Sequence, residues 1–564
     1  MKRLLKNAQV VNVFLDTLSQ ENVLIEDDKI IGVGAYQDLE ADEVIDLTGK
    51  FLCPGFLDGH IHIESTALLP YEFAKVAIPH GTSLIVADPH EIVNVAGVDG
   101  LNFILETSKD LPLDFFFMLP SCVPATKFDE SGARLLAKDL APLYDKDRVI
   151  GLAEVMDYEG VIAKNPLVID KINEAKRRNL AIDGHGPLLS GKRLDAYVAA
   201  GVESDHECSS FEEAKEKISK GQIVMIREGS AARNLDGLMG LFDEPYNHRT
   251  ILATDDKHPH DLIEEGIIDA TIRRAVKKGK SVFAAIRMAS IQTAQYFHLK
   301  GYGAIAPGYY ANVLVLDDLN NIDISSVYHK GKLVYQNHEL LPFPKRMIDQ
   351  SLFDELSDTM HVSSMKEEDF LVHETGKKEV RVMGVIAGQL ITKELHEELD
   401  FDTQNGINLE KDILKIANIE RHHNTGHYFV GYIHGIGLKE GAIATSVAHD
   451  SHNVTIIGTN EKDMAFALDE LKRIKGGQVF VKNGKLISEF PMKIAGVMSG
   501  KDAIEASKEN EELLKATYKC GVSRDLSPFM LMSFLSLTVI PELKITTKGY
   551  VNVIQDKIVP LLVK

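Results

Sequence analysis

The chain has 564 residues, of which 45% are hydrophobic and 26% charged, so it is long enough to form several globular domains. Its formal net charge of -21 opposes binding to nucleic acid or to anionic membranes, because both partners need concentrated Lys and Arg. The composition therefore favours a small-molecule partner, with no nucleic acid and no membrane.

The cysteines and the N-terminus indicate a cytoplasmic protein. Four cysteines without a CxxC pair argue against a disulfide framework and against a thiolate zinc site; they are Cys53, Cys122, Cys208 and Cys520. The first residues pass directly into a strand pattern, unlike a signal peptide. No run approaches the ~18 apolar residues of a membrane span.

Residues 1–52 are predicted to form short strands separated by polar turns. A similar pattern returns over residues 305–350, where Asp317-Asp318 and Lys330-Gly331 separate the strands. We expect the two segments to form one composite β-rich domain.

Residues 53–304, between these flanks, alternate strand-like runs with helical patterns. The predicted strands are GFLDGHIHI, TSLIVAD, LDFFFMLPS, VIGLAEV, LAIDGH, VESDHE, QIVMIRE and TILATDD. Eight such repeats in roughly 250 residues predict an α/β fold, a (β/α)8 TIM-like barrel, with its active site at the C-terminal ends of the strands.

The pattern changes near residue 350, where a charged connector begins. Residues 360–564 are predicted to form a separate C-terminal α/β domain with several strands. In this domain DMAFALDELKRIKG is an amphipathic helix, and QVFVKNGKLISEF is a hairpin that turns at Asn483-Gly484.

Potential metal ligands stand at the ends of the predicted barrel strands. His60 and His62 are two positions apart in an extended strand, so their side chains point to the same face. Two histidines alone are a weak signal. Four more candidates follow later strands: Glu154, His185, His206 and Asp255. Histidines satisfied by core packing would have no reason to gather at one end of the strands.

These six residues predict a dinuclear metal centre. His60 and His62 would hold one ion, which Asp255 completes, and His185 and His206 would hold the second. Glu154 would bridge the two ions. Nitrogen and carboxylate ligands suit Zn, Mn or Fe, and two such ions lower the pKa of a shared water to near neutrality.

The arrangement resembles the amidohydrolase superfamily in its HxH strand, its later histidines and Asp, and its split β-rich unit. Many dinuclear members carry a lysine, modified to a carbamate, at the end of strand four. This sequence departs from that pattern, because Glu154 in GLAEVMDY supplies a carboxylate directly.

Longer motifs resemble the bacterial adenine deaminase family over essentially the whole chain. They are PGFLDGHIHIEST, VADPHEI, GLAEVMDY, DGHGP, SDHE, TDDKHP and GAIATSVAHDSHN. The resemblance implies hydrolytic deamination of adenine to hypoxanthine and ammonia, with two divalent ions. Mn or Fe is expected, and Zn is the alternative.

In that reaction hydroxide adds to C6 of the purine and protons must reach the ring and the leaving amino group. Asp255 is expected to shuttle these protons. Glu154 is expected to bridge the ions, and a further role in proton transfer is the less favoured alternative. His90, after the second strand, orients the hydroxide or stabilises the adduct; otherwise it is a structural loop histidine.

Further residues near the strand ends are candidates for contacting substrate. Glu64 and Ser65 follow the first histidine pair and orient substrate or ligands, although Ser65 equally fits a helix cap. Arg227 and Glu228 end the seventh strand and either face the pocket or form an ion pair. Asp256 and His258 are expected to orient the ligands.

Two histidine clusters lie in the C-terminal domain. His449 and His452 flank Asp450, and we expect solvent-facing loop residues; a reach over the barrel mouth or a further metal site are the alternatives. The second cluster is expected to be a polar turn, with adventitious metal binding as the alternative; it consists of His422, His423 and His427.

Two other functions remain open. Another amidohydrolase would act on a cyclic amide or on a different aminated heterocycle, because the ligands specify the nucleophile and leave its target open. A non-catalytic scaffold of the same fold is the alternative from a different class, although such relatives lose ligands that this chain retains. We expect a homodimer.

Overall fold

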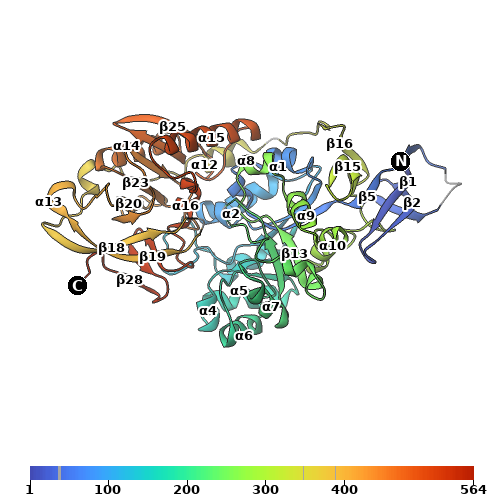
Figure 1. Ribbon diagram of the computed structural model, residues 1–564, viewed down its shortest axis with the longest axis horizontal. Coiled ribbons are helices and arrows are strands. Elements are labelled where there is room, and N and C mark those ends of the chain that lie inside the picture. The colour runs from blue at the N-terminus through green and yellow to red at the C-terminus, as the bar shows by residue number, and fades with distance from the viewer. Residues whose placement is uncertain (36–39, 231, 347, 388, 564) are drawn as a thin grey trace.

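Parallel strands form a closed barrel at the centre of the computed structural model, which describes residues 1–35, 40–230, 232–346, 348–387 and 389–563 (Figure 1). One parallel sheet has five strands and the other has three. The strands are β6 (Phe56–Ile61), β7 (Thr82–Ala87), β8 (Asp114–Leu119), β9 (Val149–Val155), β10 (Ala181–Gly184), β11 (Ser204–Asp205), β12 (Ile223–Arg227) and β13 (Thr250–Ala253).

Backbone hydrogen bonds close the ring where the two sheets meet. Asp255 N–H donates to the His60 carbonyl over 2.9 Å, which joins the end of β13 to β6. Glu203 N–H donates to the Ile182 carbonyl over 2.9 Å, which joins β11 to β10. The predicted (β/α)8 barrel is confirmed.

Barrel strands such as β7 are buried at every position, because a parallel strand is covered on both faces. Helices with one apolar face surround them, and Asn165 and Ser210 cap two of these helices. The helices are α1 (Pro70–Ala77), α2 (His90–Thr107), α3 (Ala137–Leu140), α4 (Tyr158–Ile162), α5 (Pro166–Arg177), α6 (Gly191–Ala200), α7 (Phe211–Ser219), α8 (Pro259–Glu264), α9 (Ile268–Lys277), α10 (Val282–Met288) and α11 (Ile291–Tyr296).

Strands from both flanks of the barrel form one nine-stranded sheet, at the right of Figure 1. The two flanks meet where β14 runs antiparallel to β5 and pairs Leu314 with Cys53. The strands are β1 (Lys2–Asn12), β2 (Thr17–Glu26), β3 (Lys29–Gly34), β4 (Glu43–Asp46), β5 (Phe51–Pro54), β14 (Val313–Asp318), β15 (Asp323–His329), β16 (Lys332–Gln336) and β17 (Glu339–Leu340).

After α12 (Gln350–Leu356), an eight-stranded sheet and a three-stranded sheet build the C-terminal part of the molecule, at the left of Figure 1. The larger sheet contains β18 (Lys377–Val385), β19 (Thr392–Asp400), β20 (Ile413–Ile419), β21 (Tyr428–His434), β22 (Ala442–Thr445), β23 (Val454–Gly458), β24 (Gly477–Lys482) and β25 (Lys485–Pro491). The smaller sheet contains β26 (Leu543–Thr546), β27 (Gly549–Asn552) and β28 (Lys557–Val559). The helices are α13 (Phe401–Gln404), α14 (Glu461–Arg473), α15 (Ala503–Lys519) and α16 (Pro528–Phe534).

Local sequence explains the hairpin between β24 and β25. Asn483 and Gly484 have φ angles of 52° and 65°, which suits a tight two-residue turn. The helix predicted before this hairpin is α14, which Asn460 caps through its side chain.

The loop after β8 contacts the C-terminal domain and joins it to the barrel. Asn453 Nδ2 donates to the Glu130 carbonyl over 2.8 Å, and the Glu130 carboxylate contacts His427 Nδ1 at 2.9 Å. Thr126 and Thr538 join their hydroxyls at 2.7 Å. The C-terminal domain therefore lies over the end of the barrel where the predicted ligands stand.

Across the described residues, no helix combines the length and the apolar character that crossing a membrane requires. The four cysteines are free thiols, and all but Cys520 are buried.

Candidate metal centre

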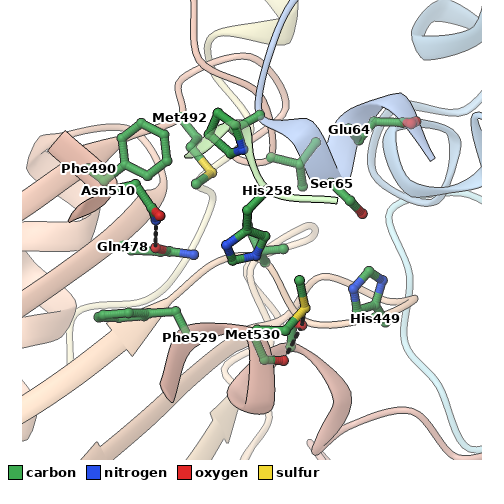
Figure 2. A pocket seen from close by; sticks show the side chains of 15 residues that line it. Glu64, Ser65, His258, His449, Gln478, Phe490, Met492, Asn510, Phe529 and Met530 are labelled. Atoms are coloured by element: carbon green, nitrogen blue, oxygen red, sulfur yellow. Dashed lines mark hydrogen bonds between the residues drawn. The ribbon is translucent and has the colours of Figure 1, made fainter. Parts of the chain in front are cut away.

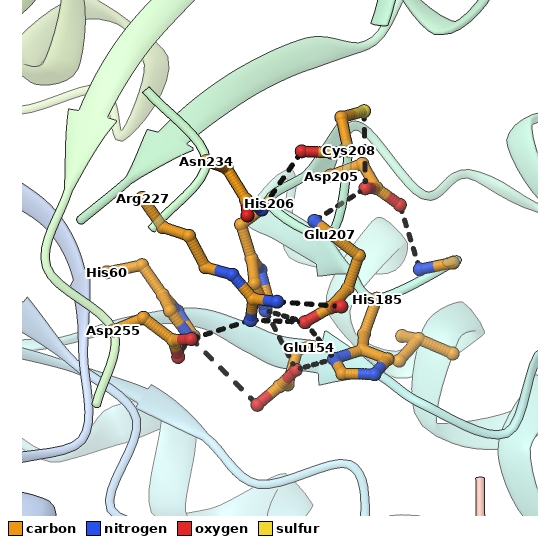
Figure 3. A network of polar contacts seen from close by, with 12 residues as sticks. His60, Glu154, His185, Asp205, His206, Glu207, Cys208, Arg227, Asn234 and Asp255 are labelled. Carbon is orange, nitrogen blue, oxygen red and sulfur yellow. Dashed lines mark hydrogen bonds and ion pairs between the residues drawn. The ribbon is translucent and has the colours of Figure 1, made fainter. Parts of the chain in front are cut away.

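All six predicted ligands meet at the C-terminal ends of the barrel strands, and each is buried. The Nε2 atoms of His60 and His62 are 3.1 Å apart. Glu154 Oε1 lies 3.3 Å from His62 Nε2, and its Oε2 lies 2.6 Å from His185 Nδ1 and 3.3 Å from His206 Nε2. Asp255 Oδ1 lies 3.2 Å from His62 Nε2. Figure 3 shows Glu154 between His60 and His185.

Buried polar groups fix the strand ends that carry these ligands. The Tyr197 hydroxyl on α6 donates to the Val155 carbonyl over 2.6 Å and accepts from His185 N–H over 2.9 Å, so it ties β9 to β10. Asp205 accepts from Gly186 N–H and from Glu207 N–H, both over 2.8 Å. These contacts orient side chains that the strand ends alone would leave mobile.

The donor set fits metal cations. His62 Nδ1 lies 3.1 Å from the Asp88 carbonyl, which can only accept, so His62 carries its proton there and its Nε2 lone pair faces the centre. Four imidazole nitrogens and two carboxylates then converge, and a cation satisfies such a set better than hydrogen bonds do.

Electrostatics keep the two carboxylates ionised. Burial raises the pKa of Glu154, but the facing imidazoles of His185 and His206 lower it, and its pKa lies well below the ordinary value. Burial likewise raises the pKa of Asp255, whereas Arg227, His60 and His62 hold it well below the ordinary value. Both groups are therefore anionic at neutral pH.

Arg227, at the end of β12, both lines the cavity and forms ion pairs. Its Nη1 lies 2.7 Å from Asp255 Oδ2, and its Nη2 donates to Glu207 Oε2 over 3.0 Å. Glu207 was missed in the sequence, although it directly follows His206 in the SDHE motif. Glu228 turns away: it accepts from Leu235 N–H over 2.8 Å and pairs with Arg274.

His90 opens α2 beside the centre. Its Nδ1 lies 2.7 Å from Asp88 Oδ2 and 3.6 Å from Glu154 Oε1, and its Nε2 lies 3.2 Å from Glu91 Oε1. Burial lowers the pKa of His90, but the surrounding acids outweigh burial and hold it well above its ordinary value. His90 is therefore a hydrogen-bond donor, with acceptors at both ring nitrogens.

Glu64 and Ser65 lie in a 3-10 turn (Ile63–Thr66) that follows β6. Glu64 Oε1 accepts from Ile92 N–H over 3.1 Å, at the start of α2, and burial followed by Glu91 raises the pKa of Glu64 to about 7. Ser65 donates to Asp256 Oδ1. It caps no helix, because α1 begins after Leu69.

The expectation that His449 and His452 face solvent is wrong. Both histidines and the intervening Asp450 are at most 4% exposed. The residues between β22 and β23 lie against the start of α2, where Glu91 contacts His449 Nδ1 and His452 Nε2. The polar composition looked like an exposed loop because the partner, Glu91, stands 358 positions earlier in the chain.

The second histidine cluster is only partly a polar turn. His423 and His427 are exposed, whereas His422 is buried, with its Nε2 2.7 Å from the Ser451 carbonyl. Burial, assisted by Arg421, lowers the pKa of His422 well below its ordinary value.

The cavity over the centre has a polar floor and a largely apolar roof. The barrel supplies the floor, including the metal-ligand candidates, Arg227 and Met156. The C-terminal domain supplies the roof, which consists of Leu390, His449, Asp450, Phe534, Leu537 and Ile540.

A second pocket adjoins this cavity, with His449 in the wall of both. In Figure 2, Ser65 and His258 of the barrel lie across from Phe529 and Met530 of the C-terminal domain. The paired amides of Gln478 and Asn510 also line it. The two pockets mark the seam between barrel and C-terminal domain.

Comparison with known proteins gives matches along nearly the whole chain. Residues 51–334 match the amidohydrolase family, and residues 389–557 match the adenine deaminase C-terminal domain. The adenine deaminase of Dehalococcoides mccartyi is 43% identical over 559 residues, which cover 99% of this chain and 96% of the relative. Adenine deaminase 2 of Carboxydothermus hydrogenoformans is 43% identical with the same coverage, and the Clostridium acetobutylicum adenine deaminase is 41% identical, covering 98% and 96%.

Proposed function

The chain belongs to the adenine deaminase family of amidohydrolases and deaminates adenine hydrolytically, and we propose that the six clustered side chains hold the two metal ions of this reaction. One observation carries the proposal: ring nitrogens of four imidazoles and oxygens of two carboxylates face one another beneath a largely apolar roof. His60, His62 and Asp255 would hold one ion, and His185 and His206 the other. Glu154, with one oxygen toward each histidine pair, would bridge them.

When bound, two such ions would lower the pKa of a water and so provide a nucleophile at neutral pH. Manganese or iron suits the imidazole and carboxylate ligands, and zinc is the alternative. The protein provides the geometry, because Tyr197 and Asp205 fix the strand ends and Arg227 holds one oxygen of Asp255.

Proton transfer is proposed for Asp255, and stabilisation of the adduct for His90. Hydrolytic deamination moves a proton from the attacking water to the purine ring and another to the departing ammonia. Asp255 Oδ1 points into the centre while Arg227 anchors Oδ2, so Oδ1 is placed to accept and return a proton. His90 carries N–H groups beside Glu154 and would stabilise charge that develops on the purine.

Leu390, Phe534 and Ile540 form an apolar surface opposite the ligands. The enclosed cavity measures only about 20 Å³, so a purine ring would lie on this surface after the C-terminal domain moves away from the barrel. Of the residues predicted to contact substrate, Arg227 lines this cavity, whereas Glu64 and Ser65 line the neighbouring pocket.

The test is ammonia release by protein loaded separately with Mn, Fe or Zn. Adenine is expected to release ammonia, while guanine and cytosine are expected to release little, and chelation is expected to abolish activity. Asp255→Asn should lower kcat by about 10²–10⁴-fold, as removal of a general acid–base does. His90→Asn should lower kcat while metal content is retained.

A metal-free protein that leaves adenine untouched would contradict the proposal. Near-normal turnover by metal-loaded Asp255→Asn would remove only the proton-transfer assignment.

We also propose that the protein works in the cytoplasm as a homodimer. The free cysteines support the reducing compartment, and the outer strands of the nine-stranded sheet offer edges for association. Sedimentation velocity should give twice the chain mass of 62.4 kDa; a single-chain mass at micromolar concentration would contradict the dimer.

A further inference from the structure

The C-terminal domain places a carboxylate in the wall of the cavity. Asp450 is 1% exposed and stands in the loop between β22 and β23, which crosses the barrel mouth. Its Oδ1 lies 3.7 Å from His90 Nε2, and the other nitrogen of His90 lies 3.6 Å from Glu154. Asp450 is thus separated from the metal ligands by the width of one imidazole.

A set of hydrogen bonds fixes this loop from both sides. Glu91 of α2 contacts His449 Nδ1 through one oxygen and His452 Nε2 through the other. From behind, His449 N–H donates to the Ser533 carbonyl over 2.7 Å, and Ser536 donates to the His449 carbonyl over 3.1 Å. The position of Asp450 is therefore rigidly determined.

Hydrogen bonds join Glu91 to His449 and His452. Ala448 N–H donates to His452 Nδ1 over 3.2 Å, so this nitrogen is an acceptor and the ring proton lies on Nε2. That proton is donated to Glu91. Burial lowers the pKa of His452 to about 4, which agrees with a neutral ring.

One oxygen of Asp450 has no partner. Oδ2 is buried and forms no hydrogen bond within the described part of the chain. Buried polar atoms are almost always bonded, because leaving one unpaired is costly. An unpaired oxygen in the wall of a substrate cavity is therefore available to a ligand that carries a hydrogen-bond donor.

Adenine carries two kinds of donor. One is the amino group on C6, which must face the metal ligands because the water attacks that carbon. The other is the single ring N–H, on the five-membered ring; the remaining ring nitrogens only accept. A carboxylate set back from the ligands by one imidazole matches the ring N–H.

We propose that Asp450 binds the N–H of the five-membered ring and thereby selects free bases over purines substituted on that nitrogen. The inference rests on the proposed function, and it makes the C-terminal domain part of the substrate site. Glu91 and His452 are positioning residues, because they act through the loop that carries Asp450.

The test compares adenine with 9-methyladenine, in which a methyl group replaces the donor proton. We expect the metal-loaded full-length wild type to prefer adenine strongly in kcat/KM. In Asp450→Ala, kcat/KM for adenine should fall about 10–100-fold, the loss typical of a hydrogen bond to a charged group, while the value for 9-methyladenine does not fall. Asp450→Asn keeps a carbonyl acceptor and should give an intermediate ratio.

Asp129→Ala is the matched control, since Asp129 lies at the same seam and accepts from Thr126 and Thr538 at 2.8 and 3.1 Å without lining the cavity. Its adenine to 9-methyladenine ratio should equal that of the wild type. Metal content and the unfolding transition verify that each variant is folded.

Three results would overturn the inference: equal wild-type turnover of both purines, equal losses for both in Asp450→Ala, or unchanged adenine turnover in Asp450→Ala and Asp450→Asn. If Asp450→Ala does not fold, the wild-type comparison and Asp450→Asn still decide. If the wild type does not deaminate adenine, the proposed function itself is wrong, and this outcome differs from the three that would overturn only the role of Asp450.

Discussion

Arg227 holds two carboxylates, Asp255 and Glu207, that would otherwise be buried side by side. Replacing it by Met removes the guanidinium that pairs with both acids, so the free energy of unfolding should fall by about 3–5 kcal/mol. Urea denaturation of the metal-loaded protein measures this. Arg233→Met removes a partly exposed pair with Glu265 and should cost at most about 1 kcal/mol. Equal losses in the two variants would contradict the role given to Arg227.

At the same scale, the barrel ligands were predictable and Asp450 was not. His60 and His62 share a strand face, and the barrel rule collects the other ligands at one rim. These are local patterns. The burial of His449 and Asp450 depends on Glu91 in another domain, and no spacing within the GAIATSVAHDSHN motif indicates that contact.

Among the elements, β26 contains an unusual residue, the buried lysine Lys544. Lys544 is buried completely and donates to the Leu390 carbonyl over 2.9 Å and the Phe534 carbonyl over 3.1 Å, two residues of the cavity roof. Burial lowers the pKa of Lys544 from 10.5 to about 7. Between these values the unfolded chain holds the proton and the folded chain does not, so this lysine makes stability rise with pH.

Between pH 7 and pH 9, the free energy of unfolding of the wild type should therefore rise relative to that of Lys544→Met, by up to about 1.4 kcal/mol per pH unit. Below pH 7 both states are protonated and the difference is constant. Urea unfolding at several pH values checks this. Lys557→Met, at an exposed position of β28, is the control and should show no such trend. Parallel curves for wild type and Lys544→Met would contradict the assignment.

For the molecule as a whole, the seam between barrel and C-terminal domain encloses the site. The residues that line the cavity, from Glu154 of the floor to Phe534 of the roof, are buried, except Leu390, which is half-buried. Substrate entry and product release therefore require the seam to open. We expect kcat to fall in proportion to added viscosity, because opening of such a cover often limits turnover. In Asp255→Asn the chemical step should limit turnover, so its kcat should not change with viscosity. A wild-type kcat that does not change with viscosity would contradict the proposal that seam opening limits turnover.

Glu154 also determines how the proposed centre can be assembled. A carbamylated lysine at this place on β9 would require carbon dioxide before the second ion could bind, whereas a glutamate needs no modification. Apo-protein should thus regain full activity from metal salt alone, at the same rate in degassed and in bicarbonate-containing buffer. A dependence on bicarbonate would show that a group other than Glu154 joins the ions.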